Sequence, residues 1–133
     1  MKRPVYQLAL TIFLYANITI VSATSFDGSK NLLCATFEVI DCGLDEQCER
    51  VRPDKLDLPL FIHLDFKNKE IRSNERAAKI EHVSSTNSNM ILQGKGQEGR
   101  GWTVVLNKES GSITGGVVGE NFVFTIFGAC TIP

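Results

Sequence analysis

Short apolar segments separated by clusters of turn-forming residues run along most of the chain. Apolar and polar residues alternate in LPLFIHLDF (58–66), GWTVVL (101–106) and NFVFTIFGAC (121–130), and the separators SSTNSN, GKGQEGRG and NKESG are typical turn sequences. This alternation predicts β-strands. Connections this short cannot hold crossover helices, so the strands are expected to pair antiparallel as a meander. The pattern therefore predicts an all-β fold of about seven or eight strands that forms a small barrel or a strongly curled sheet.

Three segments need separate treatment. Residues KNKE (67–70) are expected to turn the chain after the strand that ends at Phe66. In NERAAKIEHV (74–83), Glu75 and Lys79 are four residues apart and two alanines lie between them, which suits a helix. Alternation across this segment fits a strand, and the strand is favoured. Upstream, VRPDKLDLP is expected to hold a single helical turn that begins at Pro53, since proline suits the first helical position.

The glycines from Gly94 to Gly99 satisfy the pattern G-x-G-x-x-G of dinucleotide-binding loops. Such a loop requires a strand before the glycines and a helix after them, because the helix N-terminus supplies amides for the phosphates. Here the residues after the glycines are β-branched and alternating, which predicts a second strand. We therefore interpret this segment as a glycine-rich hairpin loop.

Residues 1–23 have the features of a secretory signal peptide. Lys2 and Arg3 precede an apolar stretch, and Val21-Ser22-Ala23 offers small residues for cleavage before Thr24. A retained membrane anchor is the alternative, although the apolar stretch is short for a membrane-spanning helix. The expected mature protein is a single domain of residues 24–133 in the periplasm or outside the cell, with no membrane attachment after cleavage.

Loss of Lys2 and Arg3 from the fourteen basic residues leaves twelve, against fifteen acidic ones. A slightly acidic domain without runs of lysine or arginine is a poor candidate for binding nucleic acid.

Four cysteines occur in the chain. An even number in an exported protein favours two disulfides. Cys42 and Cys48 are close neighbours around Gly43 and form the natural local pair, which leaves Cys34 with Cys130. That second bridge would tie the first strand to the last. The spacing does not match a usual zinc site, and neither a metal nor another cofactor is predicted.

Candidate catalytic residues are few. His63 lies beside Asp65 in the outward register of its strand, and His82 precedes a turn. The simplest interpretation is that both histidines are exposed on the surface. An enzyme that uses His63 with Asp65 or His82 remains the alternative hypothesis.

Three aromatic residues are candidates for a ligand site. Trp102 shares a strand face with Val104 and Leu106, and Phe122 and Phe124 share a face of the last strand with Cys130. Such residues can fill a core, or they can line an apolar lumen that holds a ligand. The favoured function is a non-enzymatic binding module for a small apolar ligand or an envelope protein. A structural accessory of an envelope complex is a further alternative.

The segments LPLFIHLDF (58–66), GWTVVL (101–106) and the terminal FGAC (127–130) resemble a family of small uncharacterised exported bacterial proteins. The resemblance covers nearly all of the expected mature chain. It implies export, one β domain and the cysteine framework, and it implies no activity. A weaker likeness is to the periplasmic β-barrel inhibitors of lysozyme, whose S-G-x-x-Y loop is partly echoed by Ser110-Gly111-Ser112 without the tyrosine.

Overall fold

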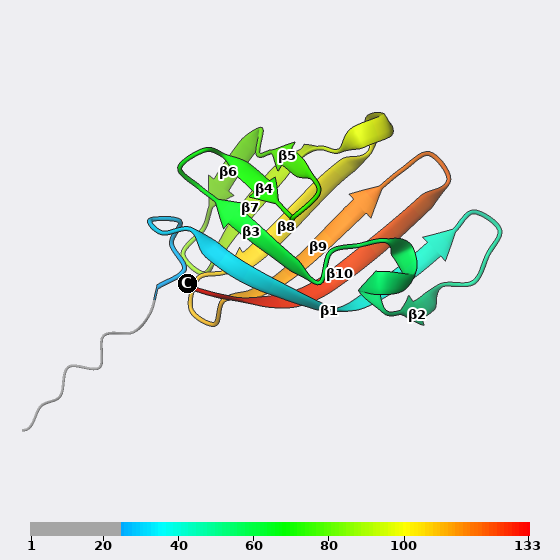
Figure 1. Ribbon diagram of the computed structural model, residues 1–133, viewed down its shortest axis with the longest axis horizontal. Coiled ribbons are helices and arrows are strands. Elements are labelled where there is room, and N and C mark those ends of the chain that lie inside the picture. Colours follow the sequence, from blue (N-terminus) through cyan, green and yellow to red (C-terminus); the bar gives the residue numbers. More distant parts are fainter. Residues whose placement is uncertain (1–24) are drawn as a thin grey trace, which may run out of the picture.

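The computed structural model describes residues 25–133, in which ten strands form one antiparallel sheet (Figure 1). The predicted signal peptide lies outside these residues. The strands are β1 (Leu32–Gly43), β2 (Glu49–Val51), β3 (Phe61–Asp65), β4 (Glu70–Arg72), β5 (Ala77–Lys79), β6 (His82–Ser85), β7 (Asn89–Lys95), β8 (Gly101–Asn107), β9 (Ser112–Val118) and β10 (Phe122–Thr131). Two short 3-10 helices, η2 (Pro53–Leu56) and η3 (Gln97–Gly99), lie between strands. The all-β prediction is confirmed.

The strand order along the sheet is β5-β4-β3-β1-β10-β9-β8-β7-β6, with β2 paired to β1 outside this path. Strands β6 to β10 form one meander and β3 to β5 form another. Pairing of the first strand with the last joins the two meanders. The prediction of seven or eight strands was too low. Strands β2 and β4 have three residues each, too few for alternation to reveal them, and Glu70, expected in a turn, is the first residue of β4.

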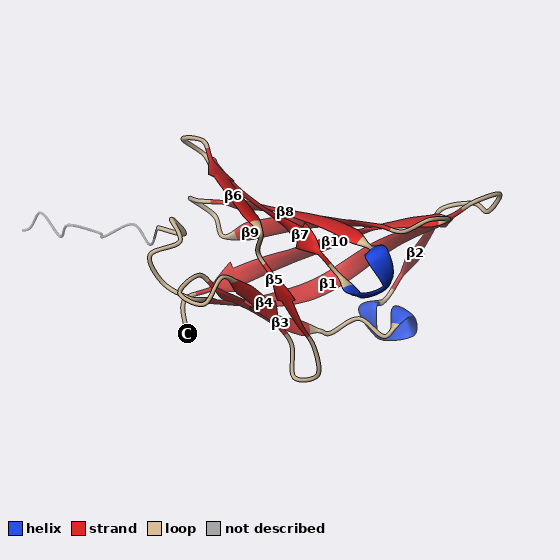
Figure 2. Cartoon of the chain, turned by 90° about the horizontal axis from the view of Figure 1, so that it is seen from above, coloured by secondary structure: helices blue, strands red, loops and turns tan. Residues whose placement is uncertain are grey.

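The sheet curls until its two edge strands approach each other. Residues Ile80 and Glu81 connect β5 to β6, the two edge strands. They hydrogen bond to two different parts of the curled sheet. The Ile80 amide donates to the Lys69 carbonyl at 2.8 Å, and the Glu81 amide donates to the Gln93 carbonyl at 2.9 Å. Figure 2 shows the resulting half-barrel, in which the β3–β4–β5 wall faces the wall of β7 to β10. The ambiguous segment 74–83 thus contains strand residues, as favoured from its alternation.

Strand β1 changes partner partway along its length. It pairs with β3 through Ala35 and with β2 from Val39 onward. A bulge between Thr36 and Glu38 separates the two parts and leaves Phe37 exposed. A bulge inserts one extra residue, so Thr36 and Val39 can both face the inside of the sheet.

The core fills one end of the half-barrel. It consists of Phe26, Leu32, Cys34, Leu64, Ile80, Met90, Leu92, Leu106, Ile113 and Cys130. Phe26 closes this end, and its amide donates to the Lys108 carbonyl at 2.9 Å. Its ring packs against Gly111, whose φ of +73° and lack of a side chain both favour glycine. The other end, near η2 and η3, has no such plug among the described residues.

Both predicted disulfides are present. Cys34 and Cys130 face each other across β1 and β10, and Cys42 and Cys48 close the hairpin between β1 and β2. Within residues 25–133, no helix is long and apolar enough to cross a membrane.

Candidate functional site: a groove at the open end of the half-barrel

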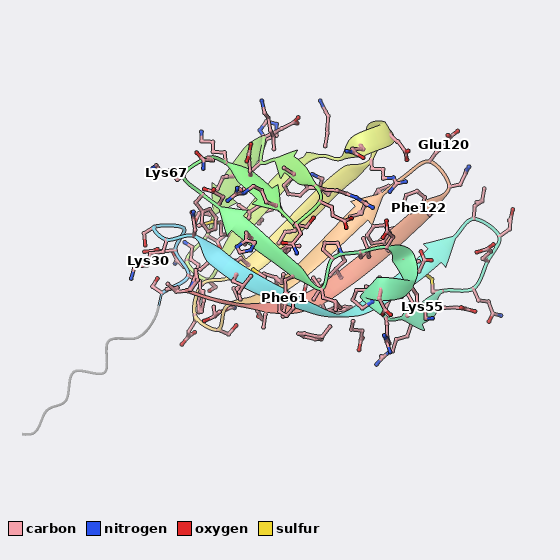
Figure 3. The ribbon with its side chains drawn as sticks, viewed as in Figure 1. Lys30, Lys55, Phe61, Lys67, Glu120 and Phe122 are labelled. Carbon is pink, nitrogen blue, oxygen red and sulfur yellow. A yellow bond between two sulfur atoms is a disulfide. The ribbon has the colours of Figure 1, made fainter. Side chains whose placement is uncertain are left out.

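The three predicted ligand-contacting residues come together at the open end. Trp102 and Phe124 both lie opposite Val117 of β9, so the three side chains form one cross-strand row. Phe122 lies two residues before Phe124 on the same face, and the two rings stack with centroids 5.8 Å apart. Figure 3 places Phe122 at the end of the molecule near Lys55 of η2, far from Lys30 and Lys67.

Gly94 extends this row on β7, directly opposite Trp102. A Cβ atom at Gly94 would overlap the indole ring and the Lys79 carbonyl oxygen. The absent side chain allows the indole ring of Trp102 and the Lys79 carbonyl of β5 to lie close to the β7 backbone. The first glycine of the G-x-G-x-x-G match is therefore needed for packing, and Gly96 to Gly99 lie in the predicted loop between the two strands.

The row forms the floor of two adjoining cavities of about 530 and 460 Å³. Leu56 and Arg100 line both cavities, and Val117 of the first is the cross-strand neighbour of Phe124 of the second. We call the two cavities together the groove. Its apolar lining consists of Leu56, Leu58, Pro59, Ile62, Ile71, Ala77, Ala78, Trp102, Val117, Leu44, Phe122 and Phe124. The volume of each cavity is in the range of small-molecule sites in proteins.

Helix η2 supplies one wall of the groove. It begins at Pro53, as predicted, and Asp57, the residue that follows its end, has the left-handed conformation, with φ 53°. The Leu58 amide donates a hydrogen bond to the Pro53 carbonyl oxygen at 3.0 Å, and the chain then leads into β3. This single turn brings Leu56 over the aromatic row. Its contribution to the groove was not predicted, because the sequence carries no signal for where a connecting turn packs.

Two arginine–carboxylate pairs lie at the rim. Arg100 donates to Glu98 at 2.7 Å, and its guanidinium lies 5.2 Å from the centroid of the Phe122 ring. Arg76 donates to Asp57. Both arginines line the larger cavity. Sequence analysis missed them, because an arginine in a turn is ordinarily a solvated surface residue.

The candidate catalytic residues lie outside the groove. His63 and His82 are exposed, as predicted, and neither lines either cavity. Asp65, expected on the outward face, is instead only 3% exposed. It accepts hydrogen bonds from the Asn68 amide at 3.0 Å, from the side chains of Asn68 and Asn31 and from Arg72 at 3.2 Å. These bonds fix the turn between β3 and β4, and no hydrogen bond between Asp65 and His63 is found in the described chain.

The hydrogen bonds at Asp65 predict an acid-sensitive element of stability. The Asn68 amide, followed by the Asn68 side chain, lowers the pKa of Asp65 below its usual value of 3.8. A lowered folded-state pKa stabilises the fold above the pKa of the unfolded chain, and this stabilisation is lost as the pH falls through the folded-state pKa. Asp65→Asn should therefore destabilise the protein at neutral pH, and the difference from wild type should shrink below about pH 4.

Urea unfolding at a series of pH values measures this difference. Glu120→Gln is the control, because Glu120 is an exposed residue in the turn between β9 and β10. Curves for Asp65→Asn and wild type that stay parallel from neutral pH to about pH 3 would contradict the assignment.

The serine-rich turn that carries the weaker resemblance joins β8 to β9. The Ser110 hydroxyl lies 3.0 Å from the Asn107 side-chain oxygen and 2.9 Å from the Ser112 hydroxyl, so the turn is internally hydrogen bonded. It lies at the end closed by Phe26, since Gly111 packs on that ring. Across residues 25–133, no group of three or more histidine, cysteine or acidic side chains is arranged to hold a metal ion.

The structure therefore defines the class of the molecule as an all-β, disulfide-linked half-barrel with a groove at one end. Comparison with protein-family models, with curated proteins and with solved structures finds no match to this chain in any of the three.

Proposed function

We propose that this protein is an exported, non-enzymatic binding module that holds a small apolar ligand in the groove. The observation that supports this most directly is the aromatic row. Trp102 and Phe124 come from different strands, yet their registers place them on either side of Val117, and they line two adjoining cavities of several hundred Å³ each. Aromatic side chains on the floor of a hollow are a common feature of ligand sites.

The asymmetry of the half-barrel supports the same proposal. The core residues and Phe26 fill one end, so the fold has its own hydrophobic core apart from the groove. The apolar side chains at the open end are then available to a ligand. Leu44, at the edge of the smaller cavity, is 67% exposed and illustrates the apolar surface that a ligand would cover.

Export is the proposed setting. Two disulfides in a small domain are typical of oxidising compartments outside the cytoplasm. The groove also favours a ligand over catalysis as its purpose, because aromatic side chains form its floor and neither histidine lines it. Native mass spectrometry of the protein purified from its own compartment would reveal either a retained small molecule or a protein partner.

Binding can be followed with Trp102, because it is the only tryptophan in the chain and lines the groove. We expect decanol or decanoate, added below the concentration at which it forms micelles, to shift and saturate the tryptophan fluorescence. Ala78→Phe should weaken this binding at least about tenfold, because Ala78 lines the larger cavity and a phenyl ring there would occupy the ligand's space.

Ala129→Phe is the matched control. Ala129 is exposed in β10 and its register places it on the face opposite Cys130, so the same substitution adds a ring outside the groove. The control should bind like wild type. If neither decanol nor decanoate produces a saturable change in wild type, the proposed function is wrong.

A further inference from the structure

We propose that two copies of this chain form a two-fold symmetric dimer through the outer face of the sheet, the face that points away from the core and the groove. The inference goes beyond the proposed function and does not depend on it. The strands concerned are β1 and β7 to β10, and Figure 1 shows β1, β10, β9 and β8 side by side in this order. A ridge and a hollow on this face have the positions that such a dimer requires.

Strands β8, β9 and β10 contain no charged residue on either face. In an antiparallel sheet with one solvated face, the residues on that face are ordinarily polar and alternate with apolar residues of the core. Here the outward positions include Val105 on β8, Val118 on β9, and Val123 and Phe127 on β10. The outer face is therefore apolar as well, and an exposed apolar face of this kind marks a surface that another molecule covers.

The ridge consists of Phe37 on β1 and Phe61 on β3, at one side of this face. Phe61 lies opposite Ala35, whose neighbours Cys34 and Thr36 are buried on the inside, so Phe61 points outward. The bulge in β1 leaves Phe37 outside too, two residues beyond Ala35. Phe37 and Phe61 are 64% and 59% exposed, although phenylalanine is usually buried in a folded domain.

The hollow lies on the other side of β10, over β7 to β9, and has a volume of about 490 Å³. Gly116 and Thr103 form one cross-strand row of its floor, and Val118 and Gly101 form the next. A Cβ atom at Gly116 or Gly101 would contact nothing within 4 Å, so the absent side chains leave the hollow open.

The charged side chains that flank the ridge and the hollow occur as ion pairs. Lys95 and Glu81 line the hollow and lie 3.9 Å apart. Arg50 and Glu38 lie 3.0 Å apart beside the ridge, on β2 and β1. Neither feature carries an uncompensated charge from these pairs. Two identical faces can therefore approach without the like-charge repulsion that separates wrong partners.

The spacing of the ridge and the hollow favours a second copy as the occupant. From β1 to β9 and β8 is two to three strand spacings, or about 10 to 14 Å. A two-fold axis that passes between them, over β10 and β9, places the ridge of each copy in the hollow of the other. Such an isologous contact uses the same patch twice. The uncharged outward residues of β9 and β10 then meet at its centre.

The area of the face is sufficient for a specific contact. From β1 to β7 the sheet spans four spacings of about 4.8 Å, and seven residues of a strand extend about 24 Å. This gives a flat area of about 450 Å² per copy, and the relief of the side chains adds to it, so a dimer would bury about 1,000 Å² in total. Specific protein interfaces begin at about this size, and we therefore expect a reversible dimer.

Sedimentation velocity of the purified protein, from about 1 to about 100 μM, tests the proposal, because an interface of this size corresponds to a micromolar Kd. We expect monomer at the lowest concentration and dimer at the highest. A protein that remains monomeric throughout would overturn the proposal. A growing series of larger assemblies would also overturn it, because ridge and hollow would then join copies in an open chain.

Two variants test the ridge and the hollow separately. Phe37→Ser removes half of the ridge, and Gly116→Gln fills the hollow with a polar side chain. Each should weaken dimerisation at least about tenfold. Both should fold like wild type, which thermal unfolding checks, because Phe37 is exposed and Gly116 has free space above it.

A mixture of these two variants tests the reciprocal contact. A mixed dimer combines the intact ridge of Gly116→Gln with the intact hollow of Phe37→Ser, so one of the two contacts is restored. The mixture should associate more tightly than either variant alone. A mixture that associates no better than its components would contradict the pairing of ridge with hollow.

Val118→Glu and Val83→Glu form a matched pair for the charge of the face. The two valines are 57% and 52% exposed, but Val83 lies opposite the core residue Leu92, which places it on the inner face of β6. Val118→Glu should shift the protein to monomer, whereas Val83→Glu should dimerise like wild type. Equal losses in the two variants would overturn the assignment to the outer face. Decanol or decanoate binding by Phe37→Ser should equal that of wild type, so a failure of the dimer is distinguishable from a failure of the groove.

Discussion

Removal of the Cys34–Cys130 disulfide is expected to lower the free energy of unfolding by about 4 to 5 kcal/mol, the loop entropy that such a crosslink takes from the unfolded chain. The two cysteines are 96 residues apart, so the bridge closes a loop that contains most of the domain. Both are also buried, at 0% and 9% exposure, and their truncation leaves space in the core. A domain of this size has about 5 to 15 kcal/mol of stability, so the variant should be close to unfolding at ambient temperature.

The double variant Cys34→Ala/Cys130→Ala tests this expectation by urea unfolding. Its matched control is Cys42→Ala/Cys48→Ala, which opens a bridge between residues only 6 apart. Loop entropy gives about 2 kcal/mol for the control. Equal losses in the two variants would show that loop closure is not the source of the stabilisation, and that β1 and β10 hold together without it.

Leu92→Ala is expected to have a second large effect, a loss of about 2 to 5 kcal/mol of unfolding free energy. Leu92 is 0% exposed and belongs to the core that fills the closed end of the half-barrel. Its neighbour across β7 and β8 is Val104, which packs against the same core. Deletion of its side chain removes apolar contacts and leaves a cavity that the surrounding strands cannot easily fill.

Leu60→Ala is the control for Leu92→Ala. Leu60 is 50% exposed, so the same truncation should change the unfolding free energy by at most about 0.5 kcal/mol. Chemical denaturation of both variants with a common slope measures the difference. A loss below about 1 kcal/mol in Leu92→Ala would mean that the core is loosely packed, contrary to the structure.

The binding experiments depend on these stability measurements. Leu92 does not line the groove, so Leu92→Ala, at a temperature where it remains folded, should still bind decanol or decanoate. Ala78→Phe should instead remain stable and lose binding, because Ala78 lies on the short edge strand β5 and lines the groove. The opposite pattern would place the ligand in the core rather than at the open end.

Much of the fold follows from local patterns in the sequence. Alternation in β8 and β10 put Trp102, Phe122 and Phe124 on defined faces, and the structure keeps those faces. The residues after the glycines excluded a helix and predicted β8. The spacing of the cysteines indicated both disulfide pairs. These features depend on a few neighbouring residues or on the chain's four cysteines, so they can be read without the tertiary structure.

The groove itself depends on contacts between distant segments. The curl of the sheet brings Arg76, from the turn before β5, and Leu56 of η2 to the cavity above the aromatic row. The burial of Asp65 likewise depends on Asn31, which lies 34 residues away in the chain. Cross-strand register and the approach of the edge strands decide these contacts, and neither leaves a periodic signal in the sequence. The sequence alone determined the strands, the faces of the aromatic residues and the crosslinks, whereas the tertiary structure decided which end of the half-barrel is filled and which charged groups line the end that stays open.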